Sequence, residues 1–295
     1  MSPDFKKLLP QRVRPALGGA WQKLKHRGQR LDRRYMRGLF GANVDLVPPA
    51  SLMFDGPVGY EVFKDNGEEF LRHYIQLAAL KPTERMLDVG SGVGRKTLPL
   101  VSYLVAEGSY EGIDIVPKGV EWCKKQYTPR FPNFRFQLID VYNHLYNPSG
   151  KHSAKDYKFR FPEAEFDFVV LNSVFTHMLA EDVENYLSEV TRVLKPGGRC
   201  LISFFLLNDE SSQLIAQGES SLNLTQEFGP ARTISREMPE DAVGFAESYV
   251  WDLYRRFGLD IQQPVHYGSW CGRKEYLSYQ DLIVATKVAP NKQEQ

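Results

Sequence analysis

Short apolar runs and amphipathic segments alternate along most of this chain, and this alternation limits the possible folds more than any other feature. Runs typical of strands cover residues 85–89, 110–115, 134–139, 166–171, 200–206, 259–265 and 281–286. Helical patterns cover residues 68–80, 97–105, 120–127, 182–194 and 246–257. Alternating units of this kind pair their strands in parallel through right-handed crossovers, with helices on both faces of the sheet. The sequence therefore predicts a doubly wound α/β domain.

Polar or basic segments flank and interrupt this domain. We expect one domain over residues 46–290, preceded by an arm at 1–45 and followed by a polar tail at 291–295. Polar stretches at about 143–165 and 208–243 are predicted to be insertions. The three cysteines are too few and too scattered for a disulfide framework. Every apolar run is far shorter than a membrane span, which needs about 20 residues. The first residues also lack the apolar region of a secretory signal. We therefore expect a cytoplasmic protein.

Charge is divided unevenly between the arm and the remainder of the chain. Residues 1–40 contain eleven Lys or Arg and two Asp, a net charge of +9, whereas the remainder carries −8. Apolar residues recur in the arm at helical spacing, which predicts a partly helical segment with a basic surface; these are Trp21, Leu24, Leu31, Tyr35 and Leu39. Such a segment can lie on an anionic membrane surface, contact a polyanion, or dock on its own acidic body. The sequence leaves these alternatives open.

The apolar run at 85–89 leads into a glycine-rich turn at residues 90–94, with the sequence GSGVG. Glycine lets a backbone turn sharply and approach a ligand without a Cβ collision. Unpaired amides at such a turn can face the ligand. The spacing is G-x-G-x-G with Asp88 just before it, whereas a dinucleotide-binding turn has G-x-G-x-x-G. The turn alone therefore indicates a ligand but does not identify it.

Acidic residues end the next two predicted strands. Asp114 follows the run that begins at 110, and Asp140 follows the run that begins at 134. The carboxyl ends of parallel strands are where open α/β sheets bind ligands. An acid after the second strand can accept hydrogen bonds from both hydroxyls of a ribose, and one after the third can accept from the amino group of a purine. Each can instead be an ordinary helix cap, but three acids in series favour a nucleoside-like ligand.

With these residues in place, the chain resembles the class I S-adenosylmethionine-dependent methyltransferases. Five motifs carry the resemblance, in order: LDVGSGVG (87–94), EGIDI (111–115), QLIDV (137–141), FDFVVLNSVFTHM (166–178) and EVTRVLKPGGRCLISFF (189–205). They cover roughly residues 66–206, with a looser match to the end of the chain. The resemblance implies a Rossmann-like, seven-stranded, mostly parallel sheet whose last strand is antiparallel. It also implies S-adenosyl-L-methionine as the cofactor.

The resemblance assigns cofactor contacts residue by residue. The glycines would line the aminoacyl end of the cofactor, and Asp88 would orient its ammonium. Asp114 would hold the ribose and Asp140 the adenine, with Ile115 and Val141 on the adenine faces. The full set implied to bind the cofactor is Asp88, Gly90, Ser91, Gly92, Gly94, Asp114, Ile115, Asp140, Val141 and Asn172.

The acceptor side carries fewer signals. An alcohol or phenol acceptor must lose a proton, and His177, six residues after the fourth strand, is our candidate base; alternatively it bonds locally at a helix start. The connection between the last two strands is predicted to border the acceptor, through His266, Tyr267, Trp270 and Arg273. Ordinary packing at the sheet edge is an equal alternative for these residues. The segment 53–60 is expected to fold over the cofactor as a lid.

Some functions are disfavoured by what the sequence does not contain. Residues 172–175 read NSVF, whereas enzymes that methylate base amines carry Asn/Asp-Pro-Pro-aromatic there, so methylation of a nucleobase amine is disfavoured and no nucleic-acid partner is expected. No metal-ligand spacing stands out, so no metal is predicted. We expect methyl transfer to an oxygen of a small molecule such as a saccharide, a lipid precursor or another metabolite. The alternatives are a protein or RNA methyltransferase that uses the arm for partner contact, or a cofactor-binding scaffold without catalysis.

Overall fold

The computed structural model describes residues 45–289. The arm predicted at 1–45 lies outside the described residues except for Asp45, and the tail at 291–295 lies outside them entirely. The partly helical arm therefore stays a prediction.

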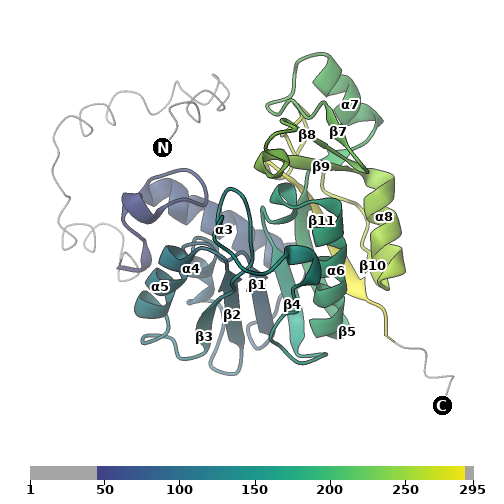
Figure 1. Cartoon of the computed structure of the whole chain (residues 1–295). Coiled ribbons are helices and arrows are strands. Elements are labelled where there is room, and N and C mark those ends of the chain that lie inside the picture. Colours follow the sequence, from purple (N-terminus) through teal and green to yellow (C-terminus); the bar gives the residue numbers. More distant parts are fainter. Residues whose placement is uncertain (1–44, 290–295) are drawn as a thin grey trace, which may run out of the picture.

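A seven-stranded sheet forms the centre of the domain (Figure 1). Its strands are β1 (Arg85–Val89), β2 (Ser109–Asp114), β3 (Phe134–Leu138), β4 (Phe166–Leu171), β5 (Leu194–Phe204), β10 (Leu259–Ile261) and β11 (Asp281–Lys287). They lie in the order β10-β11-β5-β4-β1-β2-β3. The last strand, β11, runs antiparallel to both of its neighbours, and every other pairing is parallel. This arrangement confirms the predicted doubly wound, mostly parallel sheet.

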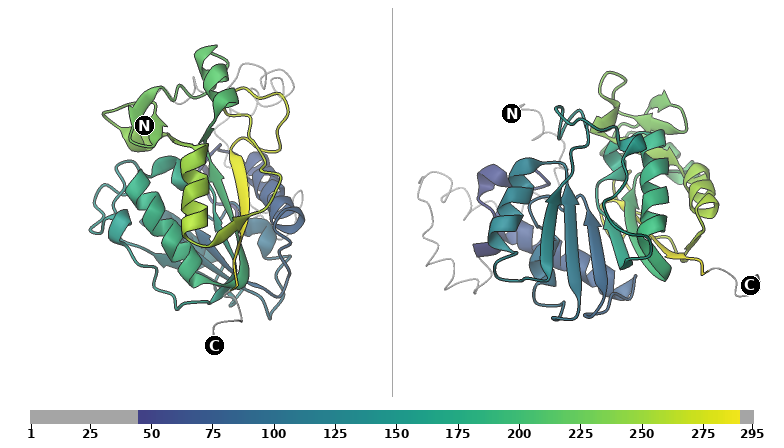
Figure 2. Two further views of the ribbon diagram at one scale, coloured as in Figure 1. Left: turned by 90° about the vertical axis from the view of Figure 1, so that its right-hand side faces the viewer. Right: turned by 60° about the horizontal axis from the view of Figure 1, so that its bottom comes forward.

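Helices cover both faces of this sheet, as Figure 2 shows with the sheet seen nearly edge-on. One face packs against α3 (Tyr60–Gln76), α4 (Thr97–Leu100) and α5 (Pro117–Gln126), and the other against α6 (Ala180–Val193) and α8 (Glu247–Arg256). Side chains of a strand point alternately to the two faces. Met86 therefore lies in the first core and Leu87 in the second, and both are fully buried.

The second polar insertion folds into a small layer at the carboxyl ends of the parallel strands (Figure 1). It contains α7 (Asp209–Ala216), β7 (Gln226–Phe228), β8 (Ala231–Thr233) and a 3₁₀ turn η7 (Pro239–Asp241). With β6 (Leu206–Leu207) and β9 (Val243–Ala246), these strands form a four-stranded sheet in the order β6-β9-β8-β7. The first insertion contains a short 3₁₀ turn, η5 (Ala154–Asp156). The second insertion thus lies where the parallel strands end, whereas the first begins there, after β3, and packs along α6 before it reaches β4.

Several element boundaries differ from those predicted from the sequence. Helix α3 begins at residue 60 rather than 68, because Gly67 and polar residues mask its first turns. Helix α4 ends at residue 100 rather than 105, where tighter turns follow, such as the bond from Ser102 N–H to Pro99 O. Strand β10 ends at Ile261 rather than at 265, close to Pro264, which has no N–H to donate to a neighbouring strand.

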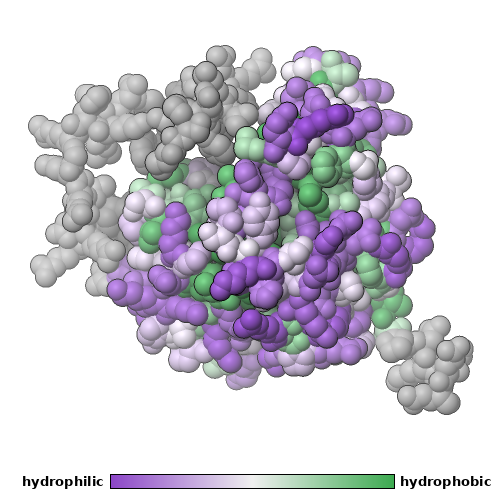
Figure 3. Space-filling view, viewed as in Figure 1, coloured by the Kyte–Doolittle hydropathy of each residue, from purple (hydrophilic) through white to green (hydrophobic). Residues whose placement is uncertain are grey.

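The surface of the described residues is mixed in character. On the face viewed in Figure 3, hydrophilic residues predominate and apolar ones form smaller patches between them. Among residues 45–289, none of the helices combines the length and apolar character that crossing a membrane requires.

Candidate cofactor and active site

The glycine-rich turn leaves β1 with three glycines at positive φ. The φ values of Gly90, Gly92 and Gly94 are 85°, 58° and 83°, a region that side chains disfavour. A Cβ on Gly90 would lie 2.5 Å from Cγ2 of Val174. The turn therefore favours glycine at these positions. The N–H groups of residues 90–94 are all hydrogen-bonded within the protein, so the unpaired amides expected at this turn are not present in the structure.

Two buried oxygen atoms beside this turn have no hydrogen-bond partner among residues 45–289. Asp88 accepts a bond from the Tyr110 hydroxyl at 2.7 Å through Oδ2, while its Oδ1 is buried and unpaired. Asn172 donates to the Tyr74 hydroxyl at 2.6 Å, and its Oδ1 is likewise buried and unpaired. Unpaired buried acceptors are costly unless a ligand satisfies them. An ammonium group, such as that of the cofactor's aminoacyl end, fits these atoms.

Asp114 braces the turn from the end of β2. Its Oδ2 accepts a bond from Gly92 N–H at 2.8 Å, and its Oδ1 accepts from Val116 N–H at 2.7 Å. Each carboxylate oxygen can accept a further bond, so ribose hydroxyls can still be bound. Burial raises the pKa of Asp114 to about 6, and it raises the pKa of Asp88 to about 6 as well.

The other predicted cofactor contacts lie along the same edge of the sheet. Asp140 is partly exposed and accepts a bond from Lys151 N–H at 3.3 Å. Val141 is buried, and Ile115 is half-buried against the same core. Ser91 is buried, and its hydroxyl has no hydrogen-bond partner among the residues that the structure describes. Because β1, β2 and β3 are adjacent, these residues form a continuous row, and their roles toward a cofactor stay predictions.

His177 ends the 3₁₀ turn η6 (Phe175–His177) that follows β4. Its Nδ1 lies 3.0 Å from the backbone oxygen of Glu240. A carbonyl oxygen can only accept, so Nδ1 carries the proton and Nε2 keeps its lone pair. Burial lowers the pKa of His177, which keeps the ring neutral near pH 7. The side chain is therefore held in the form that a general base needs.

Four segments far apart in the sequence meet over this edge of the sheet. His144 N–H, in the first insertion, donates to Oε2 of Glu240, in the second, at 2.7 Å. The Tyr146 ring contacts His177 at a centroid distance of 5.5 Å and Phe54 at 6.5 Å. We call these five residues the roof. The roof joins both insertions to the segment before α3.

No group of His, Cys, Asp and Glu within residues 45–289 is arranged to hold a metal ion.

Residues 87–202 match a family model described as a methyltransferase domain. An uncharacterized methyltransferase of Schizosaccharomyces pombe is 30% identical over 162 residues, which are 50% of this chain and 52% of that protein. Phosphoethanolamine N-methyltransferase 1 of Arabidopsis thaliana is 22% identical over 242 residues, which are 80% of this chain and 43% of that protein.

A solved structure shares the fold described above. A SAM-dependent methyltransferase from Methanosarcina mazei superposes with a TM-score of 0.50 at 20% identity, over 73% of this chain and 98% of that one. These findings confirm the resemblance to the class I S-adenosylmethionine-dependent methyltransferases, with a methyltransferase domain at residues 87–202. The resemblance implies S-adenosylmethionine as the cofactor. The chain spans about half the length of the curated relatives named here, so the acceptor does not follow from them.

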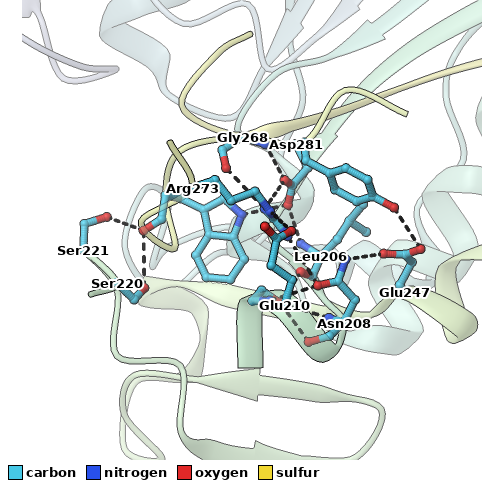
Figure 4. Close-up of polar contacts among 12 residues, drawn as sticks. Leu206, Asn208, Glu210, Ser220, Ser221, Glu247, Gly268, Arg273 and Asp281 are labelled. Carbon is cyan, nitrogen blue, oxygen red and sulfur yellow. Dashed lines mark hydrogen bonds and ion pairs between the residues drawn. The ribbon is translucent and has the colours of Figure 1, made fainter. Parts of the chain in front are cut away.

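Two of the predicted acceptor residues, Trp270 and Arg273, lie inside a buried polar network (Figure 4). Asp281, fully buried at the start of β11, accepts a bond from the Trp270 indole at 2.7 Å and from Arg273 Nη1 at 3.1 Å. Arg273 Nε also bonds to Glu210 of α7 at 2.7 Å. Trp270 is 0% exposed and Arg273 is 6% exposed. In this structure they fasten the small layer to the main sheet, and their contact with an acceptor stays a prediction.

The remaining two residues of that connection lie nearer the surface. The Tyr267 hydroxyl donates to Glu247 at 3.1 Å, and its ring lies 4.8 Å from the Arg273 guanidinium carbon. His266 is half-buried and pairs through its backbone with Leu282. Burial lowers the pKa of the His266 imidazole. Of the four predicted acceptor residues, His266 is the one whose side chain makes no hydrogen bond within the described residues.

Sequence reasoning missed several residues of the site. Tyr146 and Glu240 lie in irregular polar stretches, where no periodicity separates a site residue from a surface one. Arg95 directly follows the glycine turn and is 1% exposed, yet the sequence gives no sign that its charge is buried. A buried arginine needs a partner, and it finds one in Asp55 at 3.1 Å. The sequence offered one clue to this pair, namely the acidic Asp55 within the segment 53–60 that is predicted as a lid.

Proposed function

We propose that this methyltransferase moves a methyl group from S-adenosylmethionine to an oxygen of a small-molecule acceptor, with His177 as the base. The single observation that supports this most is the roof. Its five residues connect four segments over the site, namely those of Phe54, of His144 and Tyr146, of His177, and of Glu240. A connected cover suits a small acceptor better than a polymer, which needs an open groove.

The residues around the glycine turn suit a cationic cofactor. Asp88 and Asn172 each offer an unpaired buried oxygen to its ammonium, and Asp114 offers acceptor capacity to its ribose. Burial raises the pKa of Asp88 and of Asp114, and neighbouring carboxylates add to it, Asp55 at both sites and Asp88 at Asp114, so a positive ligand there is favoured. When bound, the cofactor supplies an activated methyl group on a sulfonium. The protein's own contribution is then mainly alignment, which can be worth about 7–11 kcal/mol of barrier.

His177 would take the proton of the acceptor hydroxyl. The Glu240 carbonyl fixes the tautomer, so Nε2 is the atom that receives the proton. The same carbonyl then stabilises the imidazolium, because Nδ1 continues to donate to it. A positioned base of this kind contributes about 10²- to 10⁴-fold in rate.

We propose that the acceptor is a small molecule. Phosphoethanolamine N-methyltransferase 1 is named for a small acceptor, which agrees with a small molecule but not with oxygen as the methylated atom. We keep a saccharide, a lipid precursor or another metabolite as the proposed classes, with His266 and Tyr267 as candidate contacts. A cytoplasmic location and a contact of the basic arm with an anionic membrane surface are further proposals.

One experiment tests the cofactor and the acceptor together. The full chain is incubated with methyl-labelled S-adenosylmethionine and a metabolite extract, and labelled products are identified by mass spectrometry. A single labelled O-methyl product supports the proposal, and an N-methyl product refutes oxygen as the acceptor atom. Label in protein or RNA instead would favour the polymer alternative. Tight cofactor binding with no labelled product in any fraction would favour a non-catalytic scaffold.

A further inference from the structure

The segment before α3 forms a short loop against the glycine turn. We call residues 53–59 the strap. Gly59 N–H closes it by donating to Sδ of Met53 at 3.5 Å. Gly56 and Gly59 have φ values of 142° and 143°, which side chains rarely adopt. These two glycines flank Pro57 and Val58, and Val58 is 55% exposed. The strap is thus a closed loop with a backbone that only glycine permits at both ends of its tip.

One side chain fastens the strap to the glycine turn. Asp55 Oδ2 accepts a bond from Val93 N–H at 3.3 Å, and its Oδ1 accepts from Nη2 of Arg95 at 3.1 Å. A Cβ on Gly92 would lie 2.3 Å from Asp55 Oδ2, so the carboxylate rests directly on the turn. Only 17% of the Asp55 side chain is exposed.

The partner of Asp55 is a buried arginine that makes few other polar contacts. Arg95 Nη2 also donates to Pro57 O at 3.1 Å, and its guanidinium carbon lies 4.6 Å from the Phe63 ring centroid. Its Nε and Nη1 are buried and have no partner within the part of the chain that the structure describes. Asp55 is the one carboxylate within salt-bridge distance of Arg95 among the described residues. Both groups that Arg95 Nη2 holds belong to the strap, so the strap's closure depends on this pair.

The strap also contributes a ring to the roof. Phe54 contacts the place where a Cβ on Gly119 would lie, at 3.0 Å, and it packs near Lys118 of α5 and Tyr146 of the first insertion. Helix α5 follows Asp114 directly. The strap therefore lies over the same edge of the sheet as the residues predicted to bind the cofactor.

We propose that the strap is a cover that must open for cofactor exchange, and that Asp55 is the positioning residue that latches it shut. This inference rests on the proposed function, since it assumes a cofactor at the glycine turn. Asp55 acts through the strap and does not touch the reacting atoms. Opening breaks the Asp55 contacts with Val93 and Arg95 together, and the glycines at 56 and 59 absorb the backbone change.

The test compares Asp55→Asn with Asp65→Asn in the full chain. Asp65 is exposed on α3, so the control makes the same chemical change without touching the latch. Dissociation of S-adenosylhomocysteine is measured by stopped flow. We expect dissociation from Asp55→Asn to be roughly ten- to a hundredfold faster, the factor that loss of a charged hydrogen bond corresponds to. Asp65→Asn should match the wild type.

Two further measurements separate a latch from a merely structural role. In hydrogen exchange of the ligand-free protein, the peptide that contains Val93 should exchange faster in Asp55→Asn and be unchanged in Asp65→Asn. In turnover, KM for the cofactor should rise while kcat stays equal or increases, whereas general destabilisation would lower kcat. Equal dissociation rates in Asp55→Asn and wild type would overturn the proposal.

A second variant keeps the test decisive if Asp55→Asn folds poorly. In Gly56→Ala the nearest atoms to the new Cβ, on Arg95, are 3.5 Å away, so only the φ of 142° is penalised. This variant should also speed dissociation, and a rate equal to wild type would count against the strap. If the wild-type chain binds no S-adenosylhomocysteine at all, the proposed function fails instead. The two failures are therefore distinguishable.

Discussion

Acid should weaken cofactor binding, because Asp88 and Asp114 hold the cofactor best as ionised carboxylates. Burial raises the pKa of each to about 6. Below that pH a proton occupies the oxygen that would accept from the cofactor, and the attraction to its positive charge is lost. At pH 5 one such group lowers affinity roughly tenfold, and two together lower it by up to roughly a hundredfold.

The same pKa shifts act in the opposite direction on the ligand-free protein. A carboxyl whose pKa is raised on folding stabilises the folded state when protonated. That contribution is fully present below the unfolded pKa, near 3.8, and is lost as the pH rises through 6. Between pH 7 and pH 5, Asp88 and Asp114 should therefore make the ligand-free protein more stable while its cofactor affinity falls.

Calorimetry of S-adenosylhomocysteine binding between pH 5 and pH 7 measures the first effect, since the ligand's own amino group titrates above this window, near pH 8. Thermal unfolding with and without the ligand measures the second. Asp88→Asn should remove one of the two titrations and halve the slope of log affinity against pH. An affinity that does not change over this range, or an equal slope in Asp88→Asn, would refute the electrostatic reasoning.

Three other perturbations test separate parts of the site. His177→Ala should slow methylation about a hundredfold or more with unchanged S-adenosylhomocysteine affinity; an unaltered pH–rate profile would withdraw its role as base. Arg273→Met leaves Asp281 buried without its cation, so urea unfolding should show a loss of about 3–5 kcal/mol, and a loss below about 1 kcal/mol would contradict the network. Deleting residues 1–40 should abolish binding to anionic vesicles but spare turnover; lost activity would mean that the arm closes the site.

Most of the fold could be predicted because its signals are local. Strand β1 is a short apolar run whose neighbours Met86 and Leu87 enter opposite cores, and such a run beside a glycine turn can be recognised from the residues themselves. Asp88 and Asp114 could be found because each marks the end of a strand, and adjacent parallel strands bring their ends together. The start of α3 was missed because Gly67 is a poor helix former by itself. In the structure, a Cβ on Gly67 would lie 2.5 Å from the backbone oxygen of Arg95. Glycine is needed there for close packing, which the sequence alone does not reveal.

The acceptor side could not be predicted, because its contacts join segments without periodicity. His144 and Glu240 are 96 residues apart, and nothing in either stretch specifies the other. Arg273 shows the same limit in another form. A lone arginine near a predicted site suggests an anionic ligand, but its charge is taken up by Asp281, eight residues on, and by Glu210, 63 residues before it. Burial decides between these roles, and burial is a property of the folded chain.

A series of contacts links the buried network around Asp281 to the candidate base His177. Asp281 accepts a bond from Leu206 N–H at 2.7 Å, which fixes the start of β6, and β6 pairs with β9. The turn η7, which carries Glu240, leads directly into β9. The carbonyl that sets the tautomer of His177 is therefore held in place from the far side of the small layer. Arg273→Met should therefore lower the methylation rate even where the protein remains folded, because the Nδ1 bond of His177 is released. If Arg273→Lys keeps the wild-type rate, the positive charge at this position is what holds the roof in place.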